Sequence, residues 1–217
     1  MRKVLTRFLA VTFTLSIAAA AQAPVLLRAA AVLNVETGAY TRPGMVLVEN
    51  GRITAVGANL TAPAGAKTID LGNLTLLPGL IDAHVHLFLH SAPAGQRVDE
   101  QGQTVHESVP ERTILATLAA KADLMAGFTA ERDMGTEGAG SADTAVRQAI
   151  NNGSIPGPRL WISGNAISIV GGHESARGYN PALLIPDNAT MVTGVNELIA
   201  TIRQQIKDGA TFIKMYE

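Results

Sequence analysis

Two patterns of hydrophobic and polar positions divide the chain at about residue 77. Between residues 25 and 77, short apolar runs alternate with turn residues, and Asn50-Gly51 is a strong β-hairpin signal. From Pro78 onward, apolar runs of strand length alternate with segments that have apolar residues at helical spacing. The first pattern predicts a small β-sandwich domain over residues 22–77. The second predicts β/α units over residues 78–217.

The strands expected in the first region follow from its apolar runs and the turns between them. They cover residues 25–32, 44–49, 52–56, 67–71 and 74–77. The region contains no histidine, and its carboxylates at Glu36, Glu49 and Asp70 form no motif. We therefore expect this domain to have a structural role.

The second region predicts four strands and three helices in alternation. The strands are expected at 80–84, 128–134, 159–163 and 212–216, and the helices at 111–126, 141–152 and 195–208. Pro110 and Gly127 bound the first helix, and Ser141 is a suitable N-cap for the second. Such alternation favours an α/β fold with a parallel sheet. Since a TIM (β/α)8 barrel has eight strands and about 250 residues, we expect the N-terminal half of such a barrel, in an N-terminal portion of a longer protein.

The first 21 residues have the pattern of a secretory signal peptide. Basic residues at Arg2, Lys3 and Arg7 precede an apolar core that runs from residue 8 to residue 21. This core is shorter than the roughly 20 residues that a membrane span needs, although an uncleaved anchor is the alternative. We expect cleavage after Ala21 and a secreted or periplasmic location in a bacterium, with no stable membrane span.

Composition and charge narrow the classes of partner. The net charge is −1 and no basic stripe is present that could neutralise phosphates, so nucleic acid is not an expected partner. Aromatic residues make up only 4% of the chain, which also argues against platforms that stack bases. The chain has no cysteine, so a metal ion would have to be bound by histidine, carboxylates or a less usual ligand.

Two histidines at the end of the expected strand 80–84 are the most informative short motif. Alternation along a strand predicts that His84 and His86 point the same way, about 6.6 Å apart along the strand. Two imidazoles at the carboxyl end of a strand are typical of a metal site on a barrel rim, whereas two histidines that merely end a strand are the alternative. Asp82 is expected to share the face of His84 and to have a structural hydrogen-bonding role.

Four blocks of sequence resemble the amidohydrolase superfamily, in particular its imidazolonepropionase-like branch. That branch includes secreted dipeptidases that act on Xaa-Pro or Xaa-Arg substrates. The first block is Leu-Pro-Gly-Leu-Ile-Asp-Ala-His-Val-His at 77–86, and the second is Gly-Phe-Thr with Arg-Asp-Met-Gly within 127–135. The third lies within 157–173 and ends in Gly-Gly-His, and the fourth is Gly-Ala-Thr-Phe-Ile-Lys at 209–214.

This resemblance implies hydrolysis of C–N bonds in cyclic amides or dipeptides by a metal-activated water. It implies a divalent metal centre with two Zn²⁺ ions, in which His84, His86 and a carboxylated Lys214 are ligands. A lysine buried in a barrel mouth can lose its proton and be carboxylated, although a lysine that extends from a strand end into solvent is the alternative. His173 is implied at the mouth of the site as a substrate-binding residue. The resemblance places the remaining ligands and the catalytic aspartate beyond residue 217, so no catalytic residue is expected in this chain.

Other candidate residues are expected to have structural roles. We expect His90 and His106 to be solvated, and Arg132 and Asp133 to form an ion pair at the barrel end. Trp161 and Phe128 are expected to pack in the core or against helices.

A second, non-catalytic function stays open alongside a hydrolase of small-molecule or dipeptide substrates. A half barrel has an open strand edge and an uncovered apolar face, both of which favour association. Such a chain would bind metal weakly, form a homo-oligomer or associate with a partner through the open barrel edge.

Overall fold

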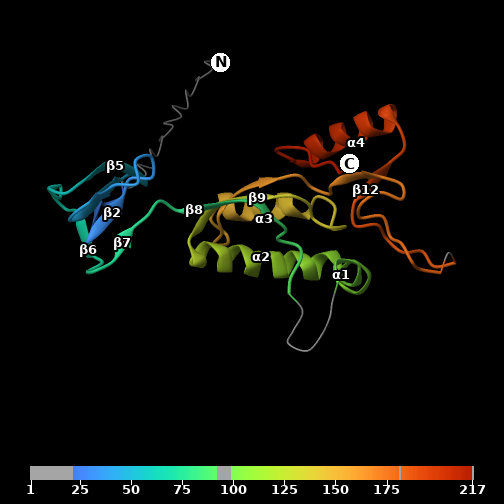
Figure 1. Ribbon diagram of the computed structural model, residues 1–217, viewed down its shortest axis with the longest axis horizontal. Helices are drawn as coiled ribbons and strands as arrows, with labels where there is room; N and C mark the ends of the chain where they lie inside the picture. Colours follow the sequence, from blue (N-terminus) through green and yellow to red (C-terminus); the bar gives the residue numbers. More distant parts are fainter. Residues whose placement is uncertain (1–21, 92–98, 181, 217) are drawn as a thin grey trace, which may run out of the picture. The chain divides into compact units, whose positions relative to one another are not determined.

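The structure is a computed structural model that describes residues 22–91, 99–180 and 182–216 (Figure 1). The chain divides into two compact units, one that ends at Pro78 and one that begins at Gly79. The expected signal peptide, residues 1–21, lies outside the described residues. In the part of the chain that is described, no helix is long and apolar enough to cross a membrane.

The first unit contains two small β-sheets. One has the strand order β5-β4-β1-β6 and the other β3-β2-β7. Their bounds are β1 Val25–Ala29, β2 Ala31–Leu33, β3 Tyr40–Thr41, β4 Gly44–Glu49, β5 Arg52–Gly57, β6 Lys67–Asp70 and β7 Thr75–Leu76. The β4–β5 hairpin turns at Asn50 and Gly51, both with positive φ, as the Asn-Gly pair predicts. A sandwich arrangement of the two sheets stays a prediction.

The apolar run 25–32 is divided between two strands, where the sequence predicts one. The break falls at Ala30, whose N–H donates a 3.0 Å hydrogen bond to the carbonyl of Leu74. β1 therefore pairs with β4 and β6, while β2 pairs with β3 and β7. A continuous apolar pattern cannot show such a break, because the residues on both sides of it are buried.

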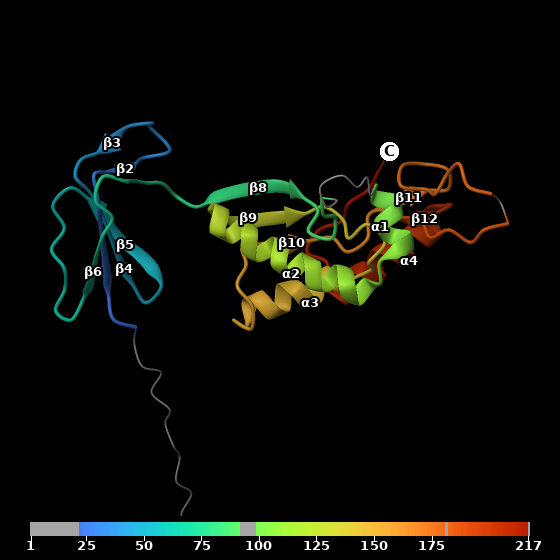
Figure 2. The same ribbon diagram turned by 90° about the horizontal axis from the view of Figure 1, so that it is seen from below.

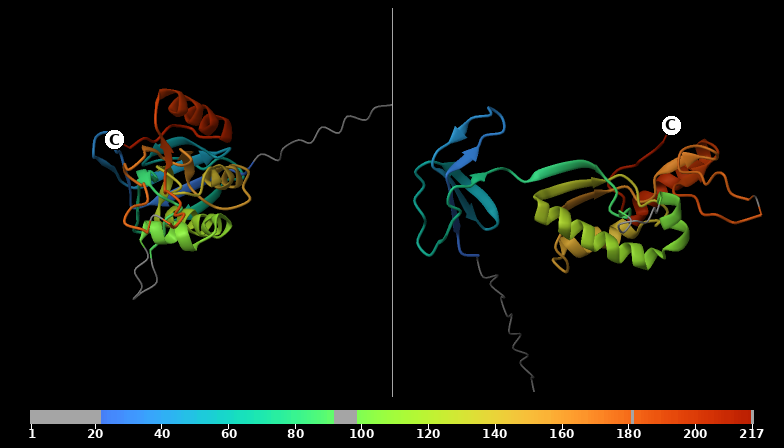
Figure 3. Two further views of the ribbon diagram at one scale, coloured as in Figure 1. Left: turned by 90° about the vertical axis from the view of Figure 1, so that its right-hand side faces the viewer. Right: turned by 60° about the horizontal axis from the view of Figure 1, so that its bottom comes forward.

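The second unit is built around a parallel three-stranded sheet with helices on one face (Figure 2). Its strands, in the order β10-β9-β8, are β8 Leu80–Val85, β9 Phe128–Asp133 and β10 Arg159–Ile162. Helices α2 (Val109–Ala126) and α3 (Ala142–Asn151) supply Ala116, Ala120 and Val146 to a core that includes Leu160 and Ile162. The right-hand view of Figure 3 shows α2 running along this face. The expected α/β fold is confirmed, and the described residues form no closed barrel.

The ends of α2 follow the local sequence signals closely, and the structure adds one short helix that was not predicted. The Ser108 side chain accepts a hydrogen bond from the backbone N–H of Glu111, so α2 begins two residues before the expected start. The helix ends at Gly127, which has φ 105°. A short helix, α1 (Glu100–His106), lies between the expected strand 80–84 and the expected helix 111–126, where no helix was predicted. The Asp99 side chain caps it by accepting a hydrogen bond from Gly102 N–H.

The region after β10 differs most from the prediction. The stretch between the expected strand 159–163 and the expected helix 195–208, where no strand was predicted, contains the parallel pair β11 (Ile167–Ile169) and β12 (Thr190–Val192), and α4 (Val195–Asp208) follows. The expected fourth strand, 212–216, is reduced to one bridge between Met215 and Ile167. The reason is that this segment bonds first to Ile162 of β10, through Thr211 N–H, and then to β11. Since β10 and β11 belong to different sheets, no continuous ladder can form.

Candidate metal centre

A shift in strand register decides where the two histidines point. Asp82 lies opposite Glu131, but Val85 lies opposite Asp133, so three steps along β8 match two along β9. An extra residue of this kind is a β-bulge, which redirects the side chains that follow it. Val85 packs against the core beneath the helices, so His84, its neighbour in the chain, lies on the other face.

Of the two expectations about Asp82, the structure contradicts the shared face with His84 and confirms the structural hydrogen bond. Asp82 lies on the face of Glu131, so the prediction that it shares the face of His84 is wrong. Its side-chain Oδ1 accepts a 2.9 Å hydrogen bond from the backbone N–H of His84, which confirms a structural hydrogen-bonding role. Asp82 therefore holds the backbone at the point where the strand changes face.

The two imidazoles converge on one point. The Nε2 atoms of His84 and His86 lie 3.3 Å apart, and the ring centroids 5.2 Å. Two nitrogens that are each bound to a tetrahedral zinc ion at 2.0–2.1 Å lie about 3.4 Å from one another. The pair therefore fits two ligands of a single metal ion.

A buried carboxylate orients the second histidine. His86 Nδ1 lies 3.0 Å from Glu137 Oε1 and 3.2 Å from the carbonyl oxygen of Gly135, and only 2% of the Glu137 side chain is exposed. Both partners accept a hydrogen bond, so they favour the tautomer with the proton on Nδ1 and leave Nε2 free to bind a metal. Sequence reasoning missed Glu137. The available signal was an acidic residue that follows β9 closely, at the end of the sheet where His86 lies.

The pKa values of the two histidines are shifted in opposite directions. Burial lowers the pKa of His86, but the hydrogen bond and negative charge of Glu137 outweigh it and raise the pKa above 6.5. The pKa of His84 is lowered by burial and by the positive charges of His86, Lys214 and Arg132. His84 thus loses its proton more readily, as a metal ligand must.

The loop that carries Glu137 is shaped by one amide oxygen. Asn165 Oδ1 accepts hydrogen bonds from Thr136 Oγ1 at 2.6 Å, Gly138 N at 3.1 Å and Gly140 N at 3.2 Å. Asn165 follows β10, so this residue joins the loops after two neighbouring strands. The loop after β9, which brings Glu137 to His86, is thereby tied to the loop after β10.

Lys214 lies near this pair without a contact to it. Its Nζ is 4.5 Å from the centroid of the Tyr216 ring, and its charge is one of those that lower the pKa of His84. The Lys214 carbonyl accepts a hydrogen bond from Ile167 N–H of β11, which fixes the backbone on this side of the site. Its role as a carboxylated ligand stays a prediction.

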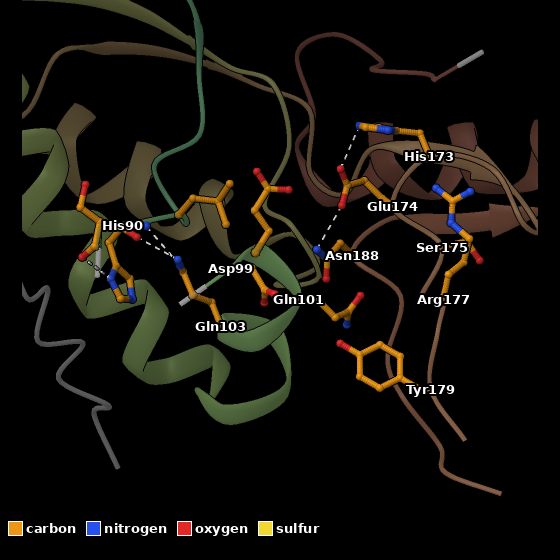
Figure 4. Close-up of a pocket in the computed structure, with 13 residues that line it drawn as sticks. His90, Asp99, Gln101, Gln103, His173, Glu174, Ser175, Arg177, Tyr179 and Asn188 are labelled. Carbon is orange, nitrogen blue, oxygen red and sulfur yellow. Dashed lines mark hydrogen bonds and ion pairs between the residues drawn. The ribbon is translucent and has the colours of Figure 1, made fainter. Parts of the chain in front are cut away.

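His173 lies at the edge of an adjoining hollow of about 840 Å³ (Figure 4). Its Nε2 is 2.9 Å from Glu174 Oε1, and its ring meets the Tyr216 ring edge-on, with 4.4 Å between centroids. Glu174 Oε2 in turn accepts a 3.1 Å hydrogen bond from Asn188 Nδ2. His173 and Lys214 therefore contact the same tyrosine, while substrate contact by His173 stays a prediction.

Several expectations about nearby residues are corrected. His90 is not simply solvated, because its Nε2 lies 2.9 Å from Glu107 and its backbone bonds to the Gln103 side chain, whereas His106 is exposed as expected. Among the described residues, Arg132 and Asp133 form no ion pair, since they lie on opposite faces of β9.

Arg132 Nε instead donates a 2.8 Å hydrogen bond to the carbonyl of Ala83 at the bulge. Trp161 is exposed on the face away from the helices, so helix-facing packing was a wrong expectation for it, whereas Phe128 is half-buried.

Carboxylates are buried on the helix-facing side of β9. Burial, with the charges of Asp123 and Asp82, raises the pKa of Glu131 to about 7. Burial and the charge of Asp143 raise the pKa of Asp133 well above its ordinary value. Glu131 Oε2 and Asp133 Oδ2 have no hydrogen-bond partner. Asp133 and His86 interact through their charges, which raises the pKa of His86 and opposes the upward shift at Asp133.

The described part of the chain holds no group of three or more histidine, aspartate, glutamate or cysteine side chains that could bind a metal. The donors present are the two histidines, with Lys214 on the same side. The residues fit part of a metal site, in which two ligands and the carboxylate that orients one of them are in place.

Comparison with known proteins identifies the family. The sequence profile of the amidohydrolase family matches residues 75–217, which is most of the chain. The chain belongs to the amidohydrolase family. The resemblance expected from the four blocks is thereby confirmed.

Members of the amidohydrolase family with known activities resemble short parts of this chain. A dihydroorotase of Geobacter sulfurreducens is 57% identical over 42 residues, which cover 19% of this chain and 10% of that protein. An imidazolonepropionase of Salinispora tropica is 38% identical over 87 residues, covering 38% and 21% respectively.

A solved amidohydrolase structure resembles nearly the whole described chain. A prolidase complexed with N-methylphosphonate-L-proline matches with a TM-score of 0.75 and 30% identity, over 88% of this chain and 46% of that protein. The chain therefore spans about half the length of this relative.

Proposed function

We propose that this protein is a metal-dependent amidohydrolase that hydrolyses C–N bonds of the cyclic-amide or dipeptide type. The observation that carries the proposal is the 3.3 Å approach of His84 Nε2 and His86 Nε2, with His86 Nδ1 held by Glu137. Dihydroorotase, imidazolonepropionase and prolidase relatives support this substrate class. A secreted or periplasmic location belongs to the same proposal.

His84 and His86 would hold a divalent metal, with Lys214 as a further ligand if it is carboxylated. The chemistry that such a metal supplies is activation of water for attack on a carbonyl carbon, and the proposal includes two Zn²⁺ ions. The residues of this chain orient the site. Glu137 keeps the His86 proton on Nδ1, and Asp82 fixes the backbone at His84.

Metal binding is tested by titrating the purified chain with Zn²⁺ in a calorimeter. We expect His86→Ala to weaken Zn²⁺ binding by at least about 100-fold, because it removes one of two histidine ligands. His106→Ala is the matched control, since His106 is exposed on α1, and its affinity is expected to stay within twofold of wild type. Equal affinities of wild type and His86→Ala would refute the metal centre.

The activity is tested on the protein expressed from its full reading frame. Zinc-loaded protein is assayed against dipeptides with a carboxyl-terminal proline and against small cyclic amides. Turnover that disappears on chelation and returns with Zn²⁺ is expected. Turnover that survives complete metal removal would contradict the proposal.

A second candidate function rests on the open edge of the sheet. β8 is the terminal strand of the three-stranded sheet, and Leu80 and Ile81 on it are 47% and 73% exposed. Exposed strand edges with apolar side chains favour association. In this case the chain would bind metal weakly and pair with a second copy or another partner. Light scattering after size-exclusion chromatography tests it, and a monodisperse monomer at high concentration would exclude it.

A further inference from the structure

Arg112 is a charged side chain buried beneath the candidate metal centre. It lies in the first turns of α2, and only 1% of the residue is exposed. None of the ion pairs between described residues includes it. Burial lowers the pKa of Arg112 and the negative charges of Glu107 and Glu137 oppose this, but a buried charge stays strongly unfavourable unless its hydrogen bonds are satisfied.

Four hydrogen bonds from the guanidinium satisfy this charge, and all of them go to backbone carbonyls. Nε and Nη2 donate to the carbonyl of Phe88 at 3.2 and 3.0 Å. Nη2 also donates to the carbonyl of Thr136 at 3.0 Å, and Nη1 to that of Glu137 at 2.7 Å. The acceptors therefore belong to only two short segments.

These two segments carry the two members of the oriented pair. Phe88 lies two residues after His86, and Glu137 is the carboxylate that contacts His86 Nδ1. A guanidinium is planar and its N–H donors have fixed directions, so it sets the spacing of the carbonyls that it binds. One side chain thus fixes how far the loop after β8 lies from the loop after β9.

We propose that Arg112 is a positioning residue that holds Glu137 at hydrogen-bond distance from His86 and so sets the metal-binding tautomer of His86. This inference rests on the proposed metal centre. The four hydrogen bonds of Arg112 all go to the two backbone segments and none to the imidazole of His84 or His86. The competing interpretation is that Arg112 contributes to core stability alone.

Two readouts separate these interpretations. The first is the tautomer of His86 in the metal-free chain, measured by long-range ¹H–¹⁵N NMR at a pH where the imidazoles are neutral. The second is the Zn²⁺ dissociation constant from calorimetry. Arg112→Met removes the hydrogen bonds and keeps an apolar stem of similar length. Arg112→Lys keeps the charge but not the fork of donors, and serves as a milder variant.

Arg147→Met is the matched control. Arg147 is a half-buried arginine on a helix, and its Nε donates a 3.0 Å hydrogen bond to the carbonyl of Leu160 in β10, away from both loops. Its loss affects packing between α3 and the sheet without a direct effect on the His86 segment.

We expect wild type and Arg147→Met to show His86 with its proton on Nδ1 and equal Zn²⁺ affinity. Arg112→Met is expected to show a mixture of tautomers and about tenfold weaker Zn²⁺ binding, as for other residues that orient metal ligands. Arg112→Lys should lie between them. Glu137→Gln, which changes the residue that contacts His86, should weaken Zn²⁺ binding as Arg112→Met does.

The inference is overturned if folded Arg112→Lys and Arg112→Met keep the wild-type tautomer and bind Zn²⁺ within twofold of wild type. The failure of the proposed metal centre would give a different, distinguishable result. If wild type binds no Zn²⁺ but Arg112→Met still changes the His86 tautomer, the positioning role holds and the proposed function fails.

Discussion

The two faces of the sheet formed by β8, β9 and β10 contrast sharply. The helix-facing side buries Leu160 and Ile162 against α2 and α3, yet it also buries Glu131 and Asp133. The other side carries His84 and the exposed residues Arg132 and Trp161. Buried carboxylates on one face and an exposed tryptophan on the other reverse the usual distribution of polar and apolar residues in a strand.

This difference shows that strand register, and not the polarity of a side chain, decides which face of the sheet a residue occupies. The bulge between Asp82 and Val85 places Asp82 with the buried carboxylates and His84 on the open side. Without that extra residue, Asp82 and His84 would share a face. The face on which His84 lies therefore depends on the bulge between Asp82 and Val85.

The largest expected effect comes from the same substitution on the two faces. Ile162→Ala should lower the free energy of unfolding by about 3 kcal/mol, because Ile162 is fully buried and leaves a cavity. Ile81→Ala on the open side should lower it by about 1 kcal/mol or less, since Ile81 is mostly exposed. Urea unfolding followed by circular dichroism measures both. Equal losses would contradict the assignment of the faces.

The next effect concerns the buried carboxylates and pH. The pKa of Glu131 is about 7 in the fold against an ordinary 4.5, so between these values the unfolded chain releases a proton that the folded chain keeps. Stability from this group is therefore lost as pH rises from 4.5 to about 7. Over that pH interval, the free energy of unfolding of Glu131→Gln should fall by about 2 kcal/mol less than that of wild type.

The measurement for Glu131 is urea unfolding of both proteins at several pH values. Glu111→Gln provides the control, because Glu111 is exposed on α2. The same pH dependence in wild type and Glu131→Gln would show that Glu131 is not desolvated on this face.

A smaller effect is expected at the bulge. Asp82→Ala removes the acceptor for His84 N–H, which should weaken Zn²⁺ binding about fivefold, equivalent to about 1 kcal/mol for one hydrogen bond. Asp82→Asn keeps a side-chain oxygen at the same position and should bind Zn²⁺ within twofold of wild type. Calorimetric titration distinguishes them, and identical affinities for all three proteins would mean that the bulge holds without Asp82.

The smallest effect separates the two histidines from each other. In the metal-free chain, NMR titration should give a pKa below 6.5 for His84 and above 6.5 for His86. Glu137→Gln should lower the pKa of His86, because burial then acts without the opposing charge. Glu107→Gln, whose partner is His90, should leave it unchanged. A pKa of His86 that does not respond to Glu137→Gln would refute the pairing.

Much of the second unit was predictable from local sequence signals. α4 covers Val195–Asp208 as expected, and Gly127 ends α2 where a left-handed residue is required. The His84–His86 motif also identified the candidate site. These features depend on neighbouring residues, which the sequence displays directly.

Other features depend on contacts between distant segments and were not predictable in the same way. The bulge in β8 arises from pairing with β9, and the reduced strand at 212–216 arises from bonds to two separate sheets. α1 was missed because its stretch is polar and lacks helical apolar spacing, although Asp99 was available as a cap. Glu137 gained its role only when its loop folded back onto His86.

The oxygen of Asn165 has a consequence for how this scaffold can change over evolution. It holds the loop after β9 through the hydroxyl of Thr136 and the backbone N–H groups of Gly138 and Gly140. None of these bonds involves the side chain of Glu137. A lineage could therefore exchange the carboxylate at this position for another side chain while the loop keeps its path, and so acquire new chemistry without a new fold.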